Sequence, residues 1–322
     1  MFEPQGSVFE PQVYAVRDRR DYPPRTLTET ADAAILKCMN SESTRVPKSS
    51  SAAPDSLKSR YGPWAVIAGA SEGLGAEFAR HLAAAGINCV LVARRAQVLD
   101  RLAAELRQEF GIEAIAAPID LAEPTATERM LAAVGDRPIG LFIFNAGGDG
   151  HATKYLDKGA QNWMPLVRRN VLTLMESVHA FGARIVSNKG GGILLVGSDA
   201  AFGGVSRLGV YSATKAFGLN LGESLWAELA PKGVDVLNLI IGATDTPTLR
   251  EVLRQRHIPV ESLVLARASE VVPAALARLG AGPTLIYGFA DDDSDTVKSS
   301  GSRRKRILDS GKFLSLFFGE DS

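Results

Sequence analysis

The segment WAVIAGASEGLGAEFARHLAAAG, residues 64–86, decides the fold of this 322-residue chain. Its first five residues form a short, wholly apolar run, which is typical of a buried strand. Gly69, Gly73 and Gly75 follow, and after them an amphipathic stretch predicts a helix. Glycines between a strand and a helix let the backbone approach a pyrophosphate, which the helix N-terminus can hold. The segment therefore predicts a strand, a phosphate-binding turn and a helix in direct succession.

The same alternation of short apolar runs and amphipathic stretches continues along the chain. Six further apolar runs are predicted to be strands, at residues 88–93, 113–119, 141–145, 192–197, 234–241 and 283–288. Strands that alternate with helices predict right-handed βαβ crossovers and a parallel sheet covered on both faces. We therefore expect one α/β domain, a doubly wound Rossmann fold of about seven strands, with its ligand beyond the carboxyl ends of the strands.

The two ends of the chain differ from this region. Residues 1–60 contain six prolines, a serine run and no sustained periodicity, which predicts a disordered N-terminal extension. Within it, Met39 is a candidate start of translation, and the sequence leaves open whether residues 1–38 are translated. We assign residues 61–290 to the nucleotide-binding catalytic domain, and residues 291–322 to an acidic linker followed by a C-terminal tail or helix.

Composition narrows the class of protein. The chain has 36 basic and 36 acidic side chains and so no net charge. Its overall electrostatic potential therefore does not favour binding to nucleic acid or to an anionic membrane. No apolar run is long enough for a transmembrane helix, and the N-terminus lacks the apolar core of a signal peptide. Two cysteines at no metal-ligand spacing and four dispersed histidines predict neither a disulfide framework nor a metal site. We expect a cytoplasmic protein.

Tyr211 and Lys215 stand four residues apart in the stretch VYSATKAFG. On a helix, such positions share a face, so the phenol and the ammonium can converge on one point. A nearby positive charge favours the phenolate and lowers the pKa of a tyrosine. The pair is therefore a candidate general acid and base near neutral pH. Composition alone produces such a pair occasionally, so the assignment depends on the motifs around it.

The second predicted strand ends in LVARR, with Ala93 where a carboxylate would bind the ribose hydroxyls of a dinucleotide. Arg94 and Arg95 follow, and two guanidinium groups there would suit a 2′-phosphate. The alternative is that both arginines lie in solvent at the start of a helix and bind no ligand. Glu72 disfavours a 2′-phosphate, because it places an anionic carboxylate in the glycine turn. The strand end favours NADP(H), with NAD(H) as the alternative.

Taken together and in this order, these stretches resemble the short-chain dehydrogenase/reductase family. The resemblance rests on GASEGLG at 69–75, Asp120 in PIDL, NAG at 145–147, Asn170 in RRNV, Ser198 in VGSDA, Tyr211 with Lys215, and IIGATDTP at 240–247. Ser198 precedes Tyr211 by 13 residues, and the glycine turn has the spacing Gly-x-x-x-Gly-x-Gly. One departure is Ile241, which replaces the proline of the family pattern. The match spans about residues 62–288.

The resemblance implies catalytic roles for four residues. Tyr211 would give a proton to the substrate carbonyl oxygen during reduction and take it back during alcohol oxidation. Lys215 would lower the pKa of Tyr211 and bind the nicotinamide ribose. Ser198 would hold the carbonyl oxygen, and Asn170 would anchor a water molecule that links Lys215 to solvent.

The resemblance also implies a nicotinamide dinucleotide cofactor. Asp120 would contact its adenine, residues 145–147 would line its middle, and Gly242 and Thr246 would face its carboxamide. The full set of expected cofactor-binding residues is Gly69, Ser71, Gly73, Leu74, Gly75, Arg94, Arg95, Asp120, Asn145, Ala146, Gly147, Tyr211, Lys215, Gly242, Thr244 and Thr246.

We therefore expect an NADP(H)-dependent oxidoreductase that interconverts a carbonyl and a secondary alcohol by hydride transfer, acting as a homodimer or homotetramer. The expected substrate is a small to medium-sized apolar carbonyl or alcohol compound: a steroid-like, fatty-acyl or xenobiotic ketone. Residues 246–266 are the expected cover of the substrate, although Leu249, Val252 and Leu253 could equally pack onto the domain.

Two other functions remain as alternatives. A non-catalytic nucleotide-sensing protein on this scaffold would typically have lost the tyrosine or the lysine. An epimerase or dehydratase of the extended branch of the family would need a Gly-x-x-Gly-x-x-Gly turn and a larger C-terminal substrate domain.

Overall fold

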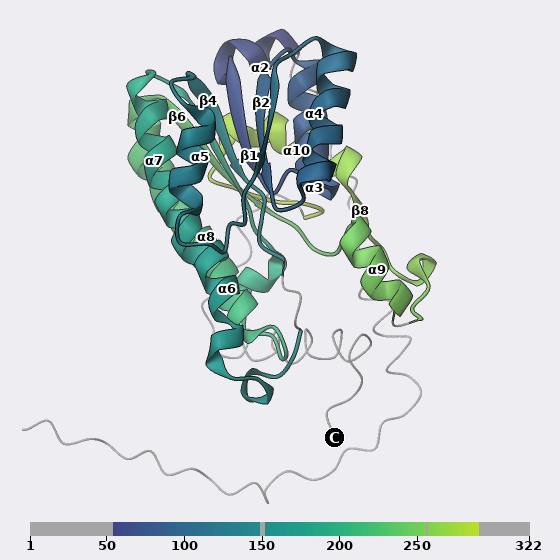
Figure 1. Ribbon diagram of the computed structural model, residues 1–322. Helices are drawn as coiled ribbons and strands as arrows, with labels where there is room; N and C mark the ends of the chain where they lie inside the picture. The colour runs from purple at the N-terminus through teal and green to yellow at the C-terminus, as the bar shows by residue number, and fades with distance from the viewer. Residues whose placement is uncertain (1–53, 149–151, 256, 290–322) are drawn as a thin grey trace, which may run out of the picture. The chain divides into compact units, whose positions relative to one another are not determined.

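The computed structural model describes residues 54–148, 152–255 and 257–289 (Figure 1). Seven parallel strands form one sheet in the order β3-β2-β1-β4-β5-β6-β9, which confirms the predicted doubly wound Rossmann fold. The strands are β1 (Trp64–Ala68), β2 (Asn88–Ala93), β3 (Ala114–Pro118), β4 (Ile139–Phe144), β5 (Gly191–Val196), β6 (Val234–Ile240) and β9 (Thr284–Ile286). Each strand overlaps one of the predicted apolar runs.

Helices cover both faces of the sheet, as Figure 1 shows. One face carries α3 (Gly73–Ala84), α4 (Ala96–Phe110) and α10 (Ala268–Arg278); the other carries α5 (Ala126–Val134), α7 (Leu174–Ser187) and α8 (Gly209–Leu229). Side chains alternate between the two faces along a strand. In β1, Ala65 and Ile67 join one hydrophobic cluster, whereas Trp64, Val66 and Ala68 join the other. Two-sided burial therefore explains why the strands are continuous apolar runs.

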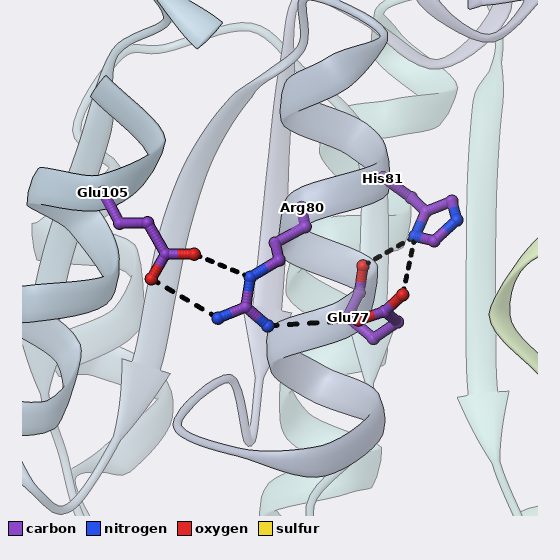
Figure 2. Close-up of polar contacts among 4 residues, drawn as sticks. All are labelled: Glu77, Arg80, His81 and Glu105. Atoms are coloured by element: carbon purple, nitrogen blue, oxygen red, sulfur yellow. Dashed lines mark hydrogen bonds and ion pairs between the residues drawn. The ribbon is translucent and has the colours of Figure 1, made fainter. Parts of the chain in front are cut away.

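Polar contacts link α3 and α4 on their outer surface. Figure 2 shows Arg80 between Glu105 of α4 and Glu77 of its own helix, with His81 beside Glu77. The Arg80 Nε to Glu105 Oε1 distance is 2.7 Å. Such exposed pairs contribute at most about 1 kcal/mol each. Burial of Phe78 and its neighbours, rather than these ion pairs, therefore determines how α3 packs.

The described chain begins with helix α2 (Pro54–Tyr61), which crosses the boundary that we placed between residues 60 and 61. Tyr61 is buried, and its hydroxyl donates to Asp235 Oδ2 at 2.9 Å. Arg60 Nη2 lies 2.7 Å from the same carboxylate oxygen. These contacts join α2 to β6, which lies far along the chain, and composition could not reveal them. The rest of the expected extension, residues 1–53, and the expected linker and tail, residues 291–322, lie outside the described residues.

We expect Tyr61→Phe to lower the free energy of unfolding by about 1.5 kcal/mol, because it removes a hydrogen bond to a carboxylate. The corresponding fall in Tm is roughly 3–6 °C. Tyr287→Phe is the matched control, since the Tyr287 hydroxyl has no hydrogen bond to any of the described residues. Chemical denaturation of both variants checks this. Equal stabilities of the Tyr61 variant and the unmutated protein would show that the Asp235 contact contributes nothing.

Additional elements lie at the carboxyl edge of the sheet. Strands β7 (Thr244–Asp245) and β8 (Ala266–Arg267) form a small parallel pair that flanks α9 (Pro247–Gln255). Helix α6 (Met164–Val167) continues into the π-helix η4 (Arg168–Thr173) and then into α7. The 3₁₀ turns are η2 (Tyr155–Asp157), η3 (Ala160–Asn162), η5 (Asp199–Phe202), η6 (Ala230–Lys232), η7 (Val260–Ser262) and η8 (Leu279–Ala281). None of the helices in the described part of the chain has the length and hydropathy that a membrane crossing requires.

Candidate active site

The motif-bearing segments meet at one edge of the sheet. The glycine turn follows β1, residues 145–147 follow β4, Ser198 follows β5 and Gly242 follows β6. These four strands are neighbours and run parallel, so their carboxyl ends lie side by side. The strand order also reverses beside β1, which is where such sheets bind their ligands.

The glycine turn is pressed against the loop after β4. A Cβ on Gly75 would stand 2.0 Å from the carbonyl oxygen of Gly69, and one on Gly69 would stand 2.7 Å from the amide nitrogen of Ala146. Asn145 Nδ2 donates to the Gly69 carbonyl at 2.9 Å. The first turn of α3 has no side-chain cap, which leaves its amide groups for a phosphate. These residues fit the pyrophosphate of a dinucleotide.

The two arginines after β2 differ in their partners. Arg95 Nη2 donates to Glu72 Oε2 at 2.6 Å and to Ser71 Oγ at 3.1 Å. Glu72 also accepts a hydrogen bond from Thr248 of α9. Burial tends to raise the pKa of Glu72, but the bonds from Thr248 and Arg95 hold it below its ordinary value. Arg94 is exposed and pairs with none of the described residues, so its charge is available to a ligand.

The segment after β6 contacts the glycine turn. The Thr246 methyl group lies 3.0 Å from the place where a Cβ on Gly73 would stand, and the Thr246 hydroxyl accepts from the Leu249 amide at the start of α9. Thr244 is buried and donates to the Gly242 carbonyl at 3.1 Å. The segment therefore reaches the same site as the turn.

Two expected cofactor residues have side chains engaged elsewhere. Leu74 packs into the hydrophobic core, so only its backbone can face a cofactor. Asp120, in the loop after β3, accepts a hydrogen bond from the Ala122 amide at 3.0 Å.

Helix α8 brings Tyr211 and Lys215 together. The Lys215 Nζ lies 5.8 Å from the centroid of the Tyr211 ring and donates to the Val196 carbonyl at 2.9 Å. Burial lowers the pKa of Lys215, and the charge of Arg169 lowers it further, to about 8. The ammonium is thus charged at neutral pH and loses its proton in mildly alkaline solution.

Asn170 is buried in η4 beside this pair. Its Nδ2 donates to the Gly147 carbonyl at 3.2 Å and to Thr214 Oγ1 at 3.0 Å. A small cavity of about 10 Å³ lies between Asn170, Lys215 and Thr214, which is enough space for one water molecule. The π-helical turn that carries Asn170 is a feature that often marks functional sites in helices.

Ser198 stands at the start of η5, which packs against α8. Its hydroxyl donates to Asp199 Oδ1 at 3.0 Å and accepts from the Ala200 amide at 3.3 Å. Asp199 reaches solvent, yet the protein packed around it removes part of its hydration, and this raises the pKa of its carboxyl despite both hydrogen bonds. Asp199 Oδ2 also lies 3.5 Å from the place where a Cβ on Gly242 would stand.

Residues 63–257 match the family model described as short chain dehydrogenase. The chain belongs to the short-chain dehydrogenase family. This confirms the resemblance and the fold class inferred from the sequence. The protein is therefore an oxidoreductase that acts on CH–OH groups and interconverts an alcohol and a carbonyl with a nicotinamide cofactor.

Three similar proteins illustrate the breadth of the family. A 7beta-hydroxysteroid dehydrogenase of Collinsella aerofaciens is 31% identical, over 74% of this chain and 90% of that protein. A very-long-chain 3-oxoacyl-CoA reductase of Podospora anserina is 34% identical, over 69% of this chain and 64% of that protein. A short-chain dehydrogenase from Sphingobium yanoikuyae, solved in complex with NADPH, has a TM-score of 0.62 at 30% identity and covers 81% of this chain and 97% of its own.

Three polar residues of this short-chain dehydrogenase site were missed in the sequence. Thr214 holds Asn170, Asp199 accepts from Ser198, and Arg169 donates to Asn170 Oδ1. Each stands next to a residue of a recognised motif or within one, so adjacency was a signal. Adjacency alone does not show which way a side chain points.

Proposed function

We propose that this short-chain dehydrogenase uses NADP(H) to interconvert a ketone and a secondary alcohol on an apolar substrate. The observation that carries the proposal is the grouping of Tyr211, Lys215 and Asn170 beside the glycine turn, with Ser198 at the end of the adjacent strand. A nucleotide-sensing protein has no need of this acid–base arrangement. The epimerase or dehydratase alternative lacks support, because the turn has the spacing Gly-x-x-x-Gly-x-Gly.

The nicotinamide cofactor supplies or accepts the hydride when bound. In this proposal Tyr211 donates a proton to the carbonyl oxygen during reduction and accepts it during oxidation. The charged form of Lys215 favours the phenolate of Tyr211. Ser198 donates to the substrate oxygen, for which its hydroxyl must turn away from Asp199. Asn170 and Thr214 hold the water-sized cavity beside Lys215, through which a proton can reach solvent.

The choice of NADP(H) rests on the end of β2. Arg94 is exposed and without a polar partner among the described residues, and Ser71 with Arg95 lies next to it in the same part of the site. The 2′-phosphate of NADP(H) fits guanidinium and hydroxyl donors. The NADPH complex of the Sphingobium relative supports the same choice.

The apolar class of substrate rests on α9 and on the relatives. Leu249 and Val252 of α9 are half-buried, while Arg250 and Arg254 pair with Asp245 and Glu251. The two arginines are therefore neutralised by carboxylates of the chain, and the leucine and valine are the side chains of α9 that can contact an apolar substrate. The names of the relatives specify a hydroxysteroid and a very-long-chain 3-oxoacyl-CoA as substrates. For this protein we propose the same kind of substrate, a steroid-like, fatty-acyl or xenobiotic ketone.

Oxidation of NADPH with a panel of ketones and aldehydes, followed at 340 nm, tests the function. We expect turnover with bulky apolar ketones, slower turnover with small polar carbonyl compounds, and weaker activity with NADH. Omission of the carbonyl compound is the control. Absence of turnover with every ketone and aldehyde would contradict the proposed function, and preference for polar compounds would contradict the substrate class.

A homodimer or homotetramer remains our proposal for the assembly. An open apolar groove lies between the continuous helix α6–η4 and the start of α8, lined by Val167, Val171, Val210 and Ala213. Tyr155 is exposed at this groove. Sedimentation or light scattering measures the mass directly. The cytoplasmic location that we expected from the sequence also stays a prediction.

A further inference from the structure

Arg169 is a charged residue of the site that the mechanism above does not use. It lies in η4 directly before Asn170 and is partly buried. Its Nε donates to Asn170 Oδ1 at 3.1 Å, and its Nη2 donates to the carbonyl of Gly148. One guanidinium group thus joins the side chain of Asn170 to the loop after β4.

The Asn170 amide has a different kind of partner at each end. Its Nδ2 donates to the Gly147 carbonyl and to Thr214, whereas its Oδ1 accepts from Arg169. A guanidinium can only donate hydrogen bonds. While Arg169 occupies this position, the amide cannot exchange its oxygen and nitrogen. Arg169 and the Gly147 carbonyl, which can only accept, therefore together fix the Asn170 amide with its donor toward Thr214.

Arg169 also lies close to Lys215. Asn170 Oδ1, which Arg169 contacts, and Lys215 Nζ each lie 3.0 Å from the same point, where a Cβ on Gly147 would stand. A guanidinium stays protonated at every pH in which the protein is folded. Of two neighbouring cations, Lys215 is therefore the one that can lose its proton.

We propose that Arg169 is a positioning residue of this site, which holds the Asn170 amide against the loop after β4 and supplies a permanent positive charge beside Lys215. The inference rests on the proposed function, because Arg169 acts through Asn170 and Lys215 and not through the substrate. It adds a charged side chain to the site, from a position directly before Asn170 to which the family resemblance assigned no role.

The described groups around Lys215 come from four elements. Tyr211 is on the same helix, the Val196 carbonyl ends β5, Gly147 is in the loop after β4 and Arg169 is in η4. Burial is the main cause that lowers the pKa of Lys215, and Arg169 is the charged group that lowers it further. The charged form of Lys215 is therefore present below about pH 8 and lost above it. Removal of Arg169 shifts this loss to higher pH.

Two substitutions separate the two effects of Arg169. Arg169→Lys keeps the charge but loses the planar pair of donors. Arg169→Met removes both, with Arg169→Gln as a second neutral variant if the methionine protein folds poorly. Arg168→Met is the matched control, because Arg168 lies in the same helix but donates to Glu176 Oε1 at 3.3 Å instead of to Asn170. Circular dichroism and Tm confirm the folding of each variant.

NMR titration of protein labelled with ¹³C at the lysine ε-carbon measures the protonation of Lys215 directly. The signal is assigned by its absence in Lys215→Met. We expect a midpoint near pH 8 in the unmutated protein, in Arg169→Lys and in Arg168→Met, and a higher midpoint in Arg169→Met. A rise of one unit would make the protonated fraction at pH 9 about five-fold larger. An unchanged midpoint in both neutral variants would overturn the charge effect.

Steady-state kinetics at pH 7 measures the positioning effect. We expect Arg169→Lys to lower kcat about 10-fold with little change in the KM of the cofactor, since a misplaced supporting group affects the reacting geometry. Arg168→Met should stay within about two-fold of the unmutated protein. Unchanged kcat in Arg169→Lys would overturn the positioning effect. If the unmutated protein reduced no carbonyl compound, the proposed function would be wrong. The NMR midpoint would still decide whether the charge of Arg169 lowers the pKa of Lys215.

Discussion

Tyr211→Phe should lower kcat by about 10² to 10⁴-fold, the usual contribution of a positioned proton donor. The substitution removes only the hydroxyl, so the ring that packs beside Lys215 Nζ remains. We therefore expect the affinity for NADPH to stay within about two-fold of that of the unmutated protein. Loss of rate with retained binding would place the defect in the chemical step and not in assembly of the site.

Stopped-flow measurement of NADPH oxidation and fluorescence titration of NADPH binding check this result together. Tyr61→Phe is the control, because the same atom is removed at α2, away from the carboxyl edge of the sheet. It should leave kcat within about two-fold. Near-normal turnover of Tyr211→Phe would show that another group supplies the proton and that the proposed mechanism is wrong.

Replacement of Ala93 by Asp together with Arg94→Ser should reverse the preference between the two cofactors. In the unmutated protein we expect NADPH to bind at least about 10-fold more tightly than NADH, equivalent to about 1.4 kcal/mol. The physical reason is that Arg94 is exposed and has no partner in the described part of the chain. A carboxylate at position 93 would instead bind ribose hydroxyls and repel a 2′-phosphate.

The charge of Glu72 does not cancel this preference. Its carboxylate already pairs with Arg95 and accepts from Thr248, so these two residues satisfy much of its hydrogen-bonding capacity. Arg94 is left as the cation that can meet a phosphate. Fluorescence titration with both cofactors, on the unmutated protein and on Arg94→Ser alone, measures its contribution. Equal affinities of the unmutated protein for NADPH and NADH would show that Arg94 does not meet the 2′-phosphate.

The fold could be predicted from the sequence because its signals are local. A strand buried on both faces is apolar at nearly every position, so a run such as residues 64–68 stands out without knowledge of its partners. Glycine is similarly required where the backbone leaves no room for a Cβ, as at Gly75. The parallel arrangement then follows from the alternation of strands with helices. The glycine turn, residues 145–147, Ser198 and Gly242 reach one edge because each follows the end of a strand, whereas η4 and α8 bring Asn170, Tyr211 and Lys215 to it.

Only the tertiary structure decided the contacts between distant segments. Tyr61 meets Asp235, 174 residues away, and this makes residues 54–61 part of the domain although their composition resembles an extension. Glu72 meets Thr248 across 176 residues, which joins the glycine turn to α9. The position of the Arg169 side chain depends on a π-helical turn that no pattern of apolar residues predicts. Such contacts leave no local signal in the sequence, because their stability depends on burial and geometry that many residues create together.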